Sequence, residues 1–256
     1  MSDAGRRVEY PTLLPASVPE DLERAKAAAA EYAVRRLRPG LRLALGTGST
    51  AAHAVRAIAA QFPGGNFDCV ASSRATEDLA RGLGLSVRPL RGGDRFDVML
   101  DGADEVADSF ALTKGGGGAL LREKLLARLS AERVILVDPT KLVHRLGERS
   151  PIPVEVVPFA RPVLESEVAQ MGFRVRLRLD REGVEFRSDN GNAILDLTPS
   201  TPLVDPAATD RALRSWTGVV ETGLFVGMAD RVVIGRPDGH ADERTPSVPG
   251  PHATSG

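Results

Sequence analysis

Cysteine is nearly absent from this chain of 256 residues, and the single one, Cys69, has no partner for an internal disulfide. A zinc cage built from cysteines needs several thiolates, so that kind of metal site is excluded as well. Cys69 stands in an apolar run from Phe67 to Val70. We therefore expect a buried, inert thiol rather than a nucleophile.

Long hydrophobic runs are also missing. No stretch approaches the ~18 apolar residues of a membrane helix, and the N-terminus has no apolar segment behind basic residues. The formal net charge is -1, so no large positive field would recruit nucleic acid or an anionic membrane. These absences predict a soluble, cytoplasmic protein with no nucleic-acid or membrane partner. A small anionic substrate stays possible, because it needs only a local basic pocket.

The sequence instead alternates short apolar segments with helical patterns. Strands are expected over residues 41–45, 67–71, 86–90, 96–100 and 133–137, with helices between them. This alternation predicts an α/β fold, a Rossmann-like parallel sheet flanked by helices. Beyond Pro151 the pattern changes to a smaller α+β, ferredoxin-like second domain, in which a hairpin is expected around Asp189-Asn190-Gly191-Asn192.

Composition and pattern together divide the chain into four parts. Residues 1–16 form a loose N-terminal extension, and residues 17–147 plus 225–235 form the α/β domain. Residues 148–224 form the α+β domain. Residues 236–256 are rich in Pro, Gly and Ser, so we expect a disordered tail.

Three loops follow strands of the expected sheet, where ligands of parallel sheets bind. The first is Gly46-Thr47-Gly48-Ser49-Thr50. A glycine-rich turn that feeds a helix offers free N–H groups and the positive helix end, which suit a phosphate. A capped tight turn is the plain alternative. Nucleotide binding is another, although Ser72-Ser73 rather than an acid ends the second strand, where the dinucleotide fingerprint requires a carboxylate.

The second loop, Asp101-Gly102-Ala103-Asp104-Glu105, carries three carboxylates directly after a buried strand. Such groups are costly to bury unless water, cations or the hydroxyls of a ligand satisfy them. A solvated acidic turn and a magnesium site both remain open interpretations at this point.

The third loop, Lys114-Gly115-Gly116-Gly117-Gly118, permits left-handed backbone and the close approach of a ligand. The helix that follows places Glu123 roughly 60° from both Leu120 and Leu126, since helical residues advance by ~100° each. A carboxylate flanked by apolar groups tends to have a raised pKa, which suits a general base. A surface glutamate is the alternative.

Lysine is scarce too, because the basic residues are nearly all arginine. The four lysines are Lys26, Lys114, Lys124 and Lys141. A compact ammonium and a planar guanidinium are not interchangeable at a tight site. The few retained lysines therefore support a functional role for the segments that carry them.

Together these segments resemble type A ribose-5-phosphate isomerases. In chain order the matching segments are Gly46 to Thr50, Asp101 to Glu105, Lys114 to Gly117 with Arg122-Glu123-Lys124, Asp138-x-x-Lys141, Pro153-Val154-Glu155-Val156 and Asp189-Asn190-Gly191-Asn192. Their order and approximate spacing hold from about residue 20 to residue 239. Six motifs in order make the resemblance specific.

The resemblance implies an aldose–ketose isomerase that interconverts ribose 5-phosphate and ribulose 5-phosphate through an enediolate. Glu123 would be the base. Asp101 and Asp104 would hold the sugar hydroxyls and assist ring opening, and Lys114 would stabilise the oxyanion. The full implied substrate site is Lys26, Thr47, Gly48, Ser49, Thr50, Asp101, Gly102, Ala103, Asp104, Lys114, Gly115, Gly116, Gly117 and Lys141. No cofactor and no metal are implied, and the expected assembly is a homodimer or a dimer of dimers.

Two rival functions share much of this pattern. An amino-sugar phosphate deaminase on a similar sheet would release ammonia and prefer a six-carbon substrate. A non-catalytic sugar-phosphate sensor would need no base, so a silent Glu123→Ala substitution would favour it. A sensor that regulates transcription should carry a helix-turn-helix segment, for which the chain before residue 40 has no room.

Overall fold

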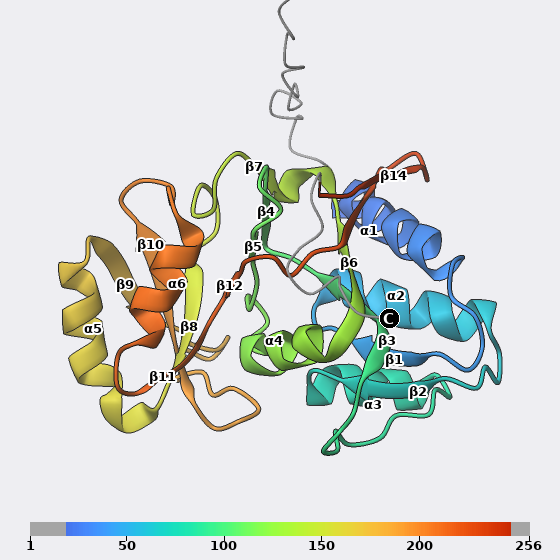
Figure 1. Cartoon of the computed structure of the whole chain (residues 1–256), viewed down its shortest axis with the longest axis horizontal. Helices are drawn as coiled ribbons and strands as arrows, with labels where there is room; N and C mark the ends of the chain where they lie inside the picture. Colours follow the sequence, from blue (N-terminus) through green and yellow to red (C-terminus); the bar gives the residue numbers. More distant parts are fainter. Residues whose placement is uncertain (1–18, 247–256) are drawn as a thin grey trace, which may run out of the picture.

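The computed structural model describes residues 19–246, which form two lobes joined by a small sheet (Figure 1). The loose extension expected for residues 1–16 and the end of the expected tail, residues 247–256, lie outside the described residues. Within residues 19–246, no helix has both the length and the apolar character to cross a membrane.

The larger lobe is built on a six-stranded sheet in the order β14-β13-β6-β3-β1-β2. Its strands are β1 (Arg42–Leu45), β2 (Asp68–Ala71), β3 (Phe96–Gly102), β6 (Ser130–Val137), β13 (Arg231–Gly235) and β14 (Ala241–Arg244). All pairings are parallel except that between β13 and β14. Their central residues are buried and mostly apolar, as is usual where helices cover both faces of a sheet. The predicted parallel sheet is confirmed.

Four helices cover the faces of this sheet: α1 (Pro19–Val34), α2 (Ser49–Gln61), α3 (Arg74–Gly82) and α4 (Leu120–Leu129). α1 and α2 share a core cluster with Leu43 and Leu45 of β1. α4 contributes Leu126 to a second cluster that contains Ala44. Because neighbouring strand residues point to opposite faces, this alternation along β1 puts α4 on the other side of the sheet from α1 and α2.

The strand expected over residues 86–90 is wrong, because that segment makes only a bridge between Val87 and Cys69. Pro89 has no N–H to continue the ladder. Arg88 instead directs its guanidinium to Asp68 and Asp94, at 2.7 Å from each. Cys69 itself is fully buried, and burial raises the pKa of its thiol to about 12. That agrees with the inert thiol expected from the sequence.

The smaller lobe has a four-stranded antiparallel sheet in the order β11-β8-β10-β9. Its elements are β8 (Ile152–Val156), η2 (Pro158–Ala160), α5 (Arg161–Gln170), β9 (Phe173–Leu177), β10 (Ala193–Pro199), α6 (Pro206–Arg214) and β11 (Val219–Thr222). The succession βαββαβ with this order is the ferredoxin-like arrangement, as expected. The hairpin expected between residues 185–187 and 193–197 is wrong, because β8 and β9 already occupy both edges of β10. The turn over residues 188–192 does form.

A third, small sheet lies between the lobes, in the order β12-β5-β4-β7. It contains β4 (Glu105–Ala107), β5 (Leu112–Thr113), β7 (Leu142–Val143), which follows η1 (Pro139–Lys141), and β12 (Leu224–Phe225). Glu105 fixes this sheet to the loop that leads into the smaller lobe. Its buried carboxylate accepts N–H groups from Gly147, Arg149 and Ser150, at 2.7, 2.6 and 2.8 Å. The third carboxylate of the acidic loop is therefore structural.

The expected disordered tail is wrong for its first part, because β14 pairs with β13 along the sheet edge. The turn between the two strands contains Pro237-Asp238-Gly239, and Gly239 has the positive φ of 88° that such turns require. Ion pairs reinforce the pairing, since Glu243 lies 3.2 Å from Arg36 and 3.4 Å from Arg231. A composition typical of disorder thus also encodes a tight hairpin.

Gly235, at the end of β13, lets α1 pack directly on the sheet backbone. A Cβ at this position would lie 1.9 Å from the carbonyl oxygen of Ala25 and 2.6 Å from the amide nitrogen of Ala29. Neither backbone atom can move aside as the end of a flexible side chain could. The distance between α1 and the sheet is therefore set by the absence of a side chain at residue 235.

We predict that Gly235→Ala lowers the free energy of unfolding by about 1–3 kcal/mol, the usual cost of forcing an extra carbon into a packed interior. Urea denaturation checks this. Gly82→Ala is the matched control, because a Cβ there meets nothing within 4 Å and its backbone is helical. The control should be neutral or slightly stabilising. Equal stability of Gly235→Ala and the parent would contradict the packing argument.

Candidate active site

A pocket of about 160 Å³ opens at the carboxyl ends of the parallel strands, where the loops after β1, β3 and β6 meet the glycine loop. It is lined by Lys26, Thr47, Gly48, Ser49, Thr50, Gly102, Ala103, Asp104, Lys114, Gly115, Gly116, Gly117, Glu123 and Lys141, with Leu22, Asp138 and Thr140 in addition. The structure thus brings the predicted site residues together. Asp101 does not line the pocket, but it lies fully buried directly behind Lys114.

Lys114 is the centre of a buried charge cluster. Its Nζ lies 2.8 Å from Asp101 Oδ2 and 3.4 Å from Glu123 Oε2, and it donates to the carbonyl oxygen of Gly102 at 2.7 Å. The exposed fractions of the three side chains are 3%, 0% and 3% for Lys114, Asp101 and Glu123. One ammonium therefore faces two buried carboxyl groups and can neutralise the charge of only one.

This imbalance changes how Glu123 ionises. Burial raises the pKa of Glu123 to about 8, Lys114 opposes that change, and the negative charges of Asp101 and Asp104 add to it. Burial acts to lower the pKa of Lys114, but the two facing carboxylates outweigh it and the net direction is upward. Glu123 Oε2 accepts no hydrogen bond from any residue in the range 19–246. A carboxyl group with a pKa near neutrality at a pocket wall is suited to proton transfer.

Asp101 is held rigidly from the side opposite Lys114. Its Oδ1 accepts the N–H groups of Gly102 at 2.8 Å and Thr47 at 3.2 Å. A Cβ on Gly46 would lie 2.0 Å from that oxygen, so only glycine permits the approach of the β1 loop to Asp101. Gly46 thus has a packing role in addition to any role in the turn.

Asp104 connects the acidic loop to the glycine loop. Its Oδ2 accepts the N–H of Gly116 at 2.8 Å, and a Cβ on Gly116 would lie 2.6 Å from its Oδ1. Gly115 has a φ of 103°, in the left-handed region that favours glycine. The glycines therefore let the backbone lie against the carboxylate and keep it at the pocket wall.

Another part of the pocket lining is basic and rich in N–H groups. Gly48, with a φ of 106°, precedes α2, and Ser49 and Thr50 occupy the first turn of that helix. Lys26 reaches the pocket from α1, where its Nζ lies 2.6 Å from Glu23 Oε1. Lys141 ends η1, whose first turn is capped by Asp138. A helix N-terminus with two ammonium groups nearby is suited to a phosphate.

Comparison with known proteins decides the family. The model of the family described as ribose 5-phosphate isomerase A (phosphoriboisomerase A) matches residues 68–239. The ribose-5-phosphate isomerase A of Thermomicrobium roseum is 45% identical over 219 residues, which are 85% of this chain and 92% of the relative. The chain belongs to the ribose 5-phosphate isomerase A family.

Solved structures agree with this assignment. Ribose 5-phosphate isomerase A from Methanocaldococcus jannaschii is 33% identical, with a TM-score of 0.81 over 87% of this chain and 99% of that one. A D-ribose-5-phosphate isomerase in complex with phospho-erythronic acid is 30% identical, with a TM-score of 0.84 over 88% and 99%. The chain is therefore an isomerase, and the predicted family and fold class are confirmed.

One lysine of this isomerase lies outside the pocket. Lys124 turns away from Glu123 and pairs with Glu221 of β11 at 2.9 Å, while it donates to the carbonyl oxygen of Thr222 at 2.7 Å. Its Nζ also lies 4.9 Å from the ring centre of Phe225. Of the four lysines, Lys26, Lys114 and Lys141 line the pocket, whereas Lys124 joins α4 to the smaller lobe.

The sequence did not single out Leu22 or Thr140 for the pocket, and Asp138 entered only as part of a matching motif. Asp138-Pro139-Thr140 after β6 is a signal that could have found the last two. Within residues 19–246, no group of three or more His, Cys, Asp or Glu side chains is placed to hold a metal ion.

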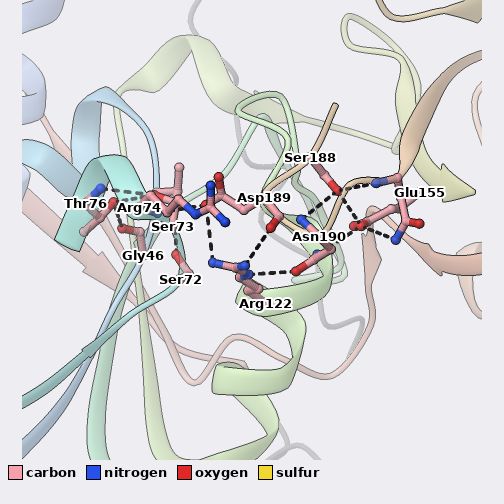
Figure 2. A network of polar contacts seen from close by, with 12 residues as sticks. Gly46, Ser72, Ser73, Arg74, Thr76, Arg122, Glu155, Ser188, Asp189 and Asn190 are labelled. Atoms are coloured by element: carbon pink, nitrogen blue, oxygen red, sulfur yellow. Dashed lines mark hydrogen bonds and ion pairs between the residues drawn. The ribbon is translucent and has the colours of Figure 1, made fainter. Parts of the chain in front are cut away.

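The smaller lobe of the isomerase contacts α3 and α4 of the larger lobe through the turn at Asp189 and Asn190 (Figure 2). Arg122, next to Glu123 on α4, donates to Asn190 Oδ1 at 2.8 Å and to the carbonyl oxygen of Asp189 at 2.9 Å. Asp189 Oδ2 accepts the N–H of Arg74, the first residue of α3, at 2.8 Å. The turn expected from the sequence is thus also a contact between the lobes.

The N-terminal end of α3 in turn supports the loop at residues 46–50, as Figure 2 also shows. Thr76 Oγ1 donates to the carbonyl oxygen of Gly46 at 2.9 Å, and Ser73 caps the helix. Ser72 Oγ lies 2.6 Å from Thr47 Oγ1. On the far side of the turn, the buried Glu155 binds Ser188, Asn190 and Asn192 at 2.8, 3.0 and 2.9 Å. Hydrogen bonds to segment 72–76 thus connect the turn and β8 on one side with the first loop on the other, where Thr47 lines the pocket.

The raised pKa of Glu123 predicts a pH-dependent effect on stability. Because the folded state holds the Glu123 proton up to a pH of about 8, against an ordinary value of 4.5, this residue stabilises the fold at low pH. That contribution is lost as the pH rises from 4.5, the ordinary pKa, through about 8, the pKa in the folded state. Glu123→Gln cannot lose a proton, so its stability relative to the parent should increase from pH 5 to pH 9.

Urea denaturation of both proteins at pH 5, 7 and 9 measures this difference. Glu31→Gln, on the exposed side of α1, is the control for loss of a carboxylate. A difference between parent and Glu123→Gln that does not change with pH, or that changes in favour of the parent, would contradict the assignment.

Proposed function

We propose that this protein interconverts D-ribose 5-phosphate and D-ribulose 5-phosphate, the isomerisation of the non-oxidative pentose phosphate pathway. The observation that carries the proposal is the buried Glu123 beside Lys114 at a pocket of which another part is suited to a phosphate. The solved relative in complex with phospho-erythronic acid supports a phosphorylated polyhydroxy ligand for this pocket.

In this mechanism Glu123 removes the proton from C2 of the open-chain aldose and returns it to C1. The electron pair of the broken C–H bond forms the C1–C2 double bond of an enediolate, and negative charge develops on the C1 oxygen. A second proton leaves the C2 hydroxyl and is delivered to the C1 oxygen, which yields the ketose. The family resemblance assigns that second transfer and ring opening to Asp101 and Asp104, of which Asp104 lines the pocket and Asp101 lies buried beside Lys114.

Lys114 supplies the electrostatic part of the catalysis. Its ammonium is fixed by Asp101 and by the carbonyl oxygen of Gly102 before substrate arrives, so little reorganisation accompanies the build-up of charge. Gly115, Gly116 and Gly117 line the same pocket. Charge on the enediolate oxygens is thus met by groups that are already in place, and the mechanism requires no metal or organic cofactor.

The phosphate is assigned to the basic part of the pocket lining. Ser49 and Thr50 at the start of α2 offer hydroxyl and backbone donors, and Lys26 adds a positive charge from α1. Thr47 and Lys141 complete the substrate site. Gly48, Gly102 and Ala103 lie along the wall without a polar side chain, where the sugar chain can pass close to the backbone.

A cytoplasmic location and a homodimer or dimer of dimers remain part of the proposal. They rest on the family resemblance, and gel filtration with light scattering would test the assembly.

We predict that the purified protein converts ribose 5-phosphate to ribulose 5-phosphate in excess EDTA, and that Glu123→Gln lowers kcat at least ~100-fold, as expected for loss of a general base. Conversion is followed by the appearance of the ketose. If both proteins bind the sugar phosphate but neither converts it, the protein is a sensor. Ammonia release from an amino-sugar phosphate would instead support the deaminase.

The pH dependence of kcat/KM tests the same assignment. Because the base must be ionised in the free enzyme, kcat/KM should rise with pH and level off above a pH of about 8. Removal of the negative charge of Asp101 leaves Lys114 to pair with Glu123 alone. The inflection in Asp101→Asn should therefore lie at lower pH, measured on its residual activity. A profile that is flat between pH 6 and 9 in the parent would contradict Glu123 as the base.

A further inference from the structure

Arg178 is a residue of the smaller lobe that binds the backbone of the glycine loop. It follows β9, and its side chain is only 13% exposed. Its Nη1 donates to the carbonyl oxygens of Gly115 at 2.7 Å and Gly116 at 3.1 Å. The same guanidinium is fixed by Asp196 of β10, which accepts both Nε, at 2.9 Å, and Nη2.

The two carbonyl groups bound by Arg178 belong to the peptides that join residues 115–116 and 116–117. In a trans peptide the C=O and N–H groups point in opposite directions, and the described residues contain no cis peptide bond. Fixing a carbonyl oxygen on the Arg178 side therefore directs the N–H of the next residue to the other side of the loop. For the first peptide this N–H is that of Gly116, which donates to Asp104.

The second peptide directs the N–H of Gly117 away from Arg178 in the same way. Gly117 lines the pocket, and within residues 19–246 its N–H donates to no other group. An N–H that faces a pocket and has no protein partner is available to an oxygen of the substrate. The loop has no side chains of its own to choose between peptide orientations, since glycines permit many backbone conformations.

Arginine is the residue type suited to this task. Its planar fork can bind a carboxylate on one edge and carbonyl oxygens on another, whereas an ammonium is a compact point charge without a fixed fork of donors. The Arg178 guanidinium also lies 6.0 Å from the ring centre of Phe186, and Phe186 occupies the space that a Cβ on Gly118 would need, 2.5 Å away. The smaller lobe thus packs against the glycine loop at two neighbouring points.

We propose that Arg178 is a positioning residue of the isomerisation, which orients the two peptides so that Gly116 holds Asp104 and Gly117 presents its N–H to the developing oxyanion. The inference rests on the proposed function and deepens it. Arg178 does not line the pocket itself, so it acts through the loop. Its contribution should appear in the transition state, where the oxyanion is charged, more than in binding of the phosphate.

The test compares Arg178→Met with Arg174→Met. Arg174 is an exposed arginine on β9 of the same sheet and is the control for loss of a surface guanidinium. For Arg178→Met we expect kcat for ribose 5-phosphate to fall ~10- to 100-fold, less than the ~100- to 1,000-fold lost when an oxyanion donor itself is removed, with KM changed less than about twofold. Competitive inhibition by inorganic phosphate should be unchanged, and inhibition by phospho-erythronic acid should weaken.

Other outcomes separate this inference from the proposed function. If the parent does not convert ribose 5-phosphate, the proposed function fails. If the parent is active and folded Arg178→Met has the same kcat, or if KM and phosphate inhibition change while kcat does not, only the positioning role is overturned. If circular dichroism shows that Arg178→Met does not fold, Arg178→Lys decides, because it keeps the charge beside Asp196. A lower kcat at unchanged KM in that variant supports the role, and parent-like kcat overturns it.

Discussion

The contact of one buried ammonium with two buried carboxyl groups is the constraint on which the rest of the pocket depends. Lys114 cannot neutralise both Asp101 and Glu123, and water does not reach them well enough to do so. The cluster therefore still holds a proton near neutral pH. The pKa of Glu123 is close enough to neutrality for that proton to be transferred in either direction. An isomerase needs this property, since the same group must accept a proton from one carbon and return it to the next.

Such a cluster is costly to hold together, and both lobes contribute to its support. The residues that line the pocket all lie between Leu22 and Lys141, within the larger lobe. The smaller lobe instead holds the backbone that carries them. Arg178 binds the glycine loop, the turn at Asp189 binds α3 and Arg122, and β11 pairs with Lys124 behind Glu123. The ferredoxin-like lobe thus supports the backbone that carries the pocket residues, although it contributes no lining residue of its own.

Much of the site could be predicted because its signals are local. Glycine-rich turns after strands, an acidic loop and a glutamate between two leucines of a helix are all visible within a few residues. The contacts by which the smaller lobe supports the pocket could not be predicted in this way. Arg178 is separated from Gly115 by 63 residues, and in the sequence it is one of several arginines of an alternating strand. The absent hairpin partner at 185–187 has the same origin, since apolar alternation does not tell that both edges of β10 are already occupied. The segment 86–90 fails for a local reason instead, because Pro89 has no N–H to continue a ladder beside β2.

The contact between Gly235 and Ala25 has a consequence for how substrate affinity can change. Lys26 is the next residue after Ala25, so the height of its ammonium above the pocket is set by how deeply α1 lies on β13. A glycine on β13 thereby sets the position of a lysine that lines the pocket. A substitution at such a position would appear in an enzyme assay as weaker binding of the substrate, although the substituted residue does not line the pocket.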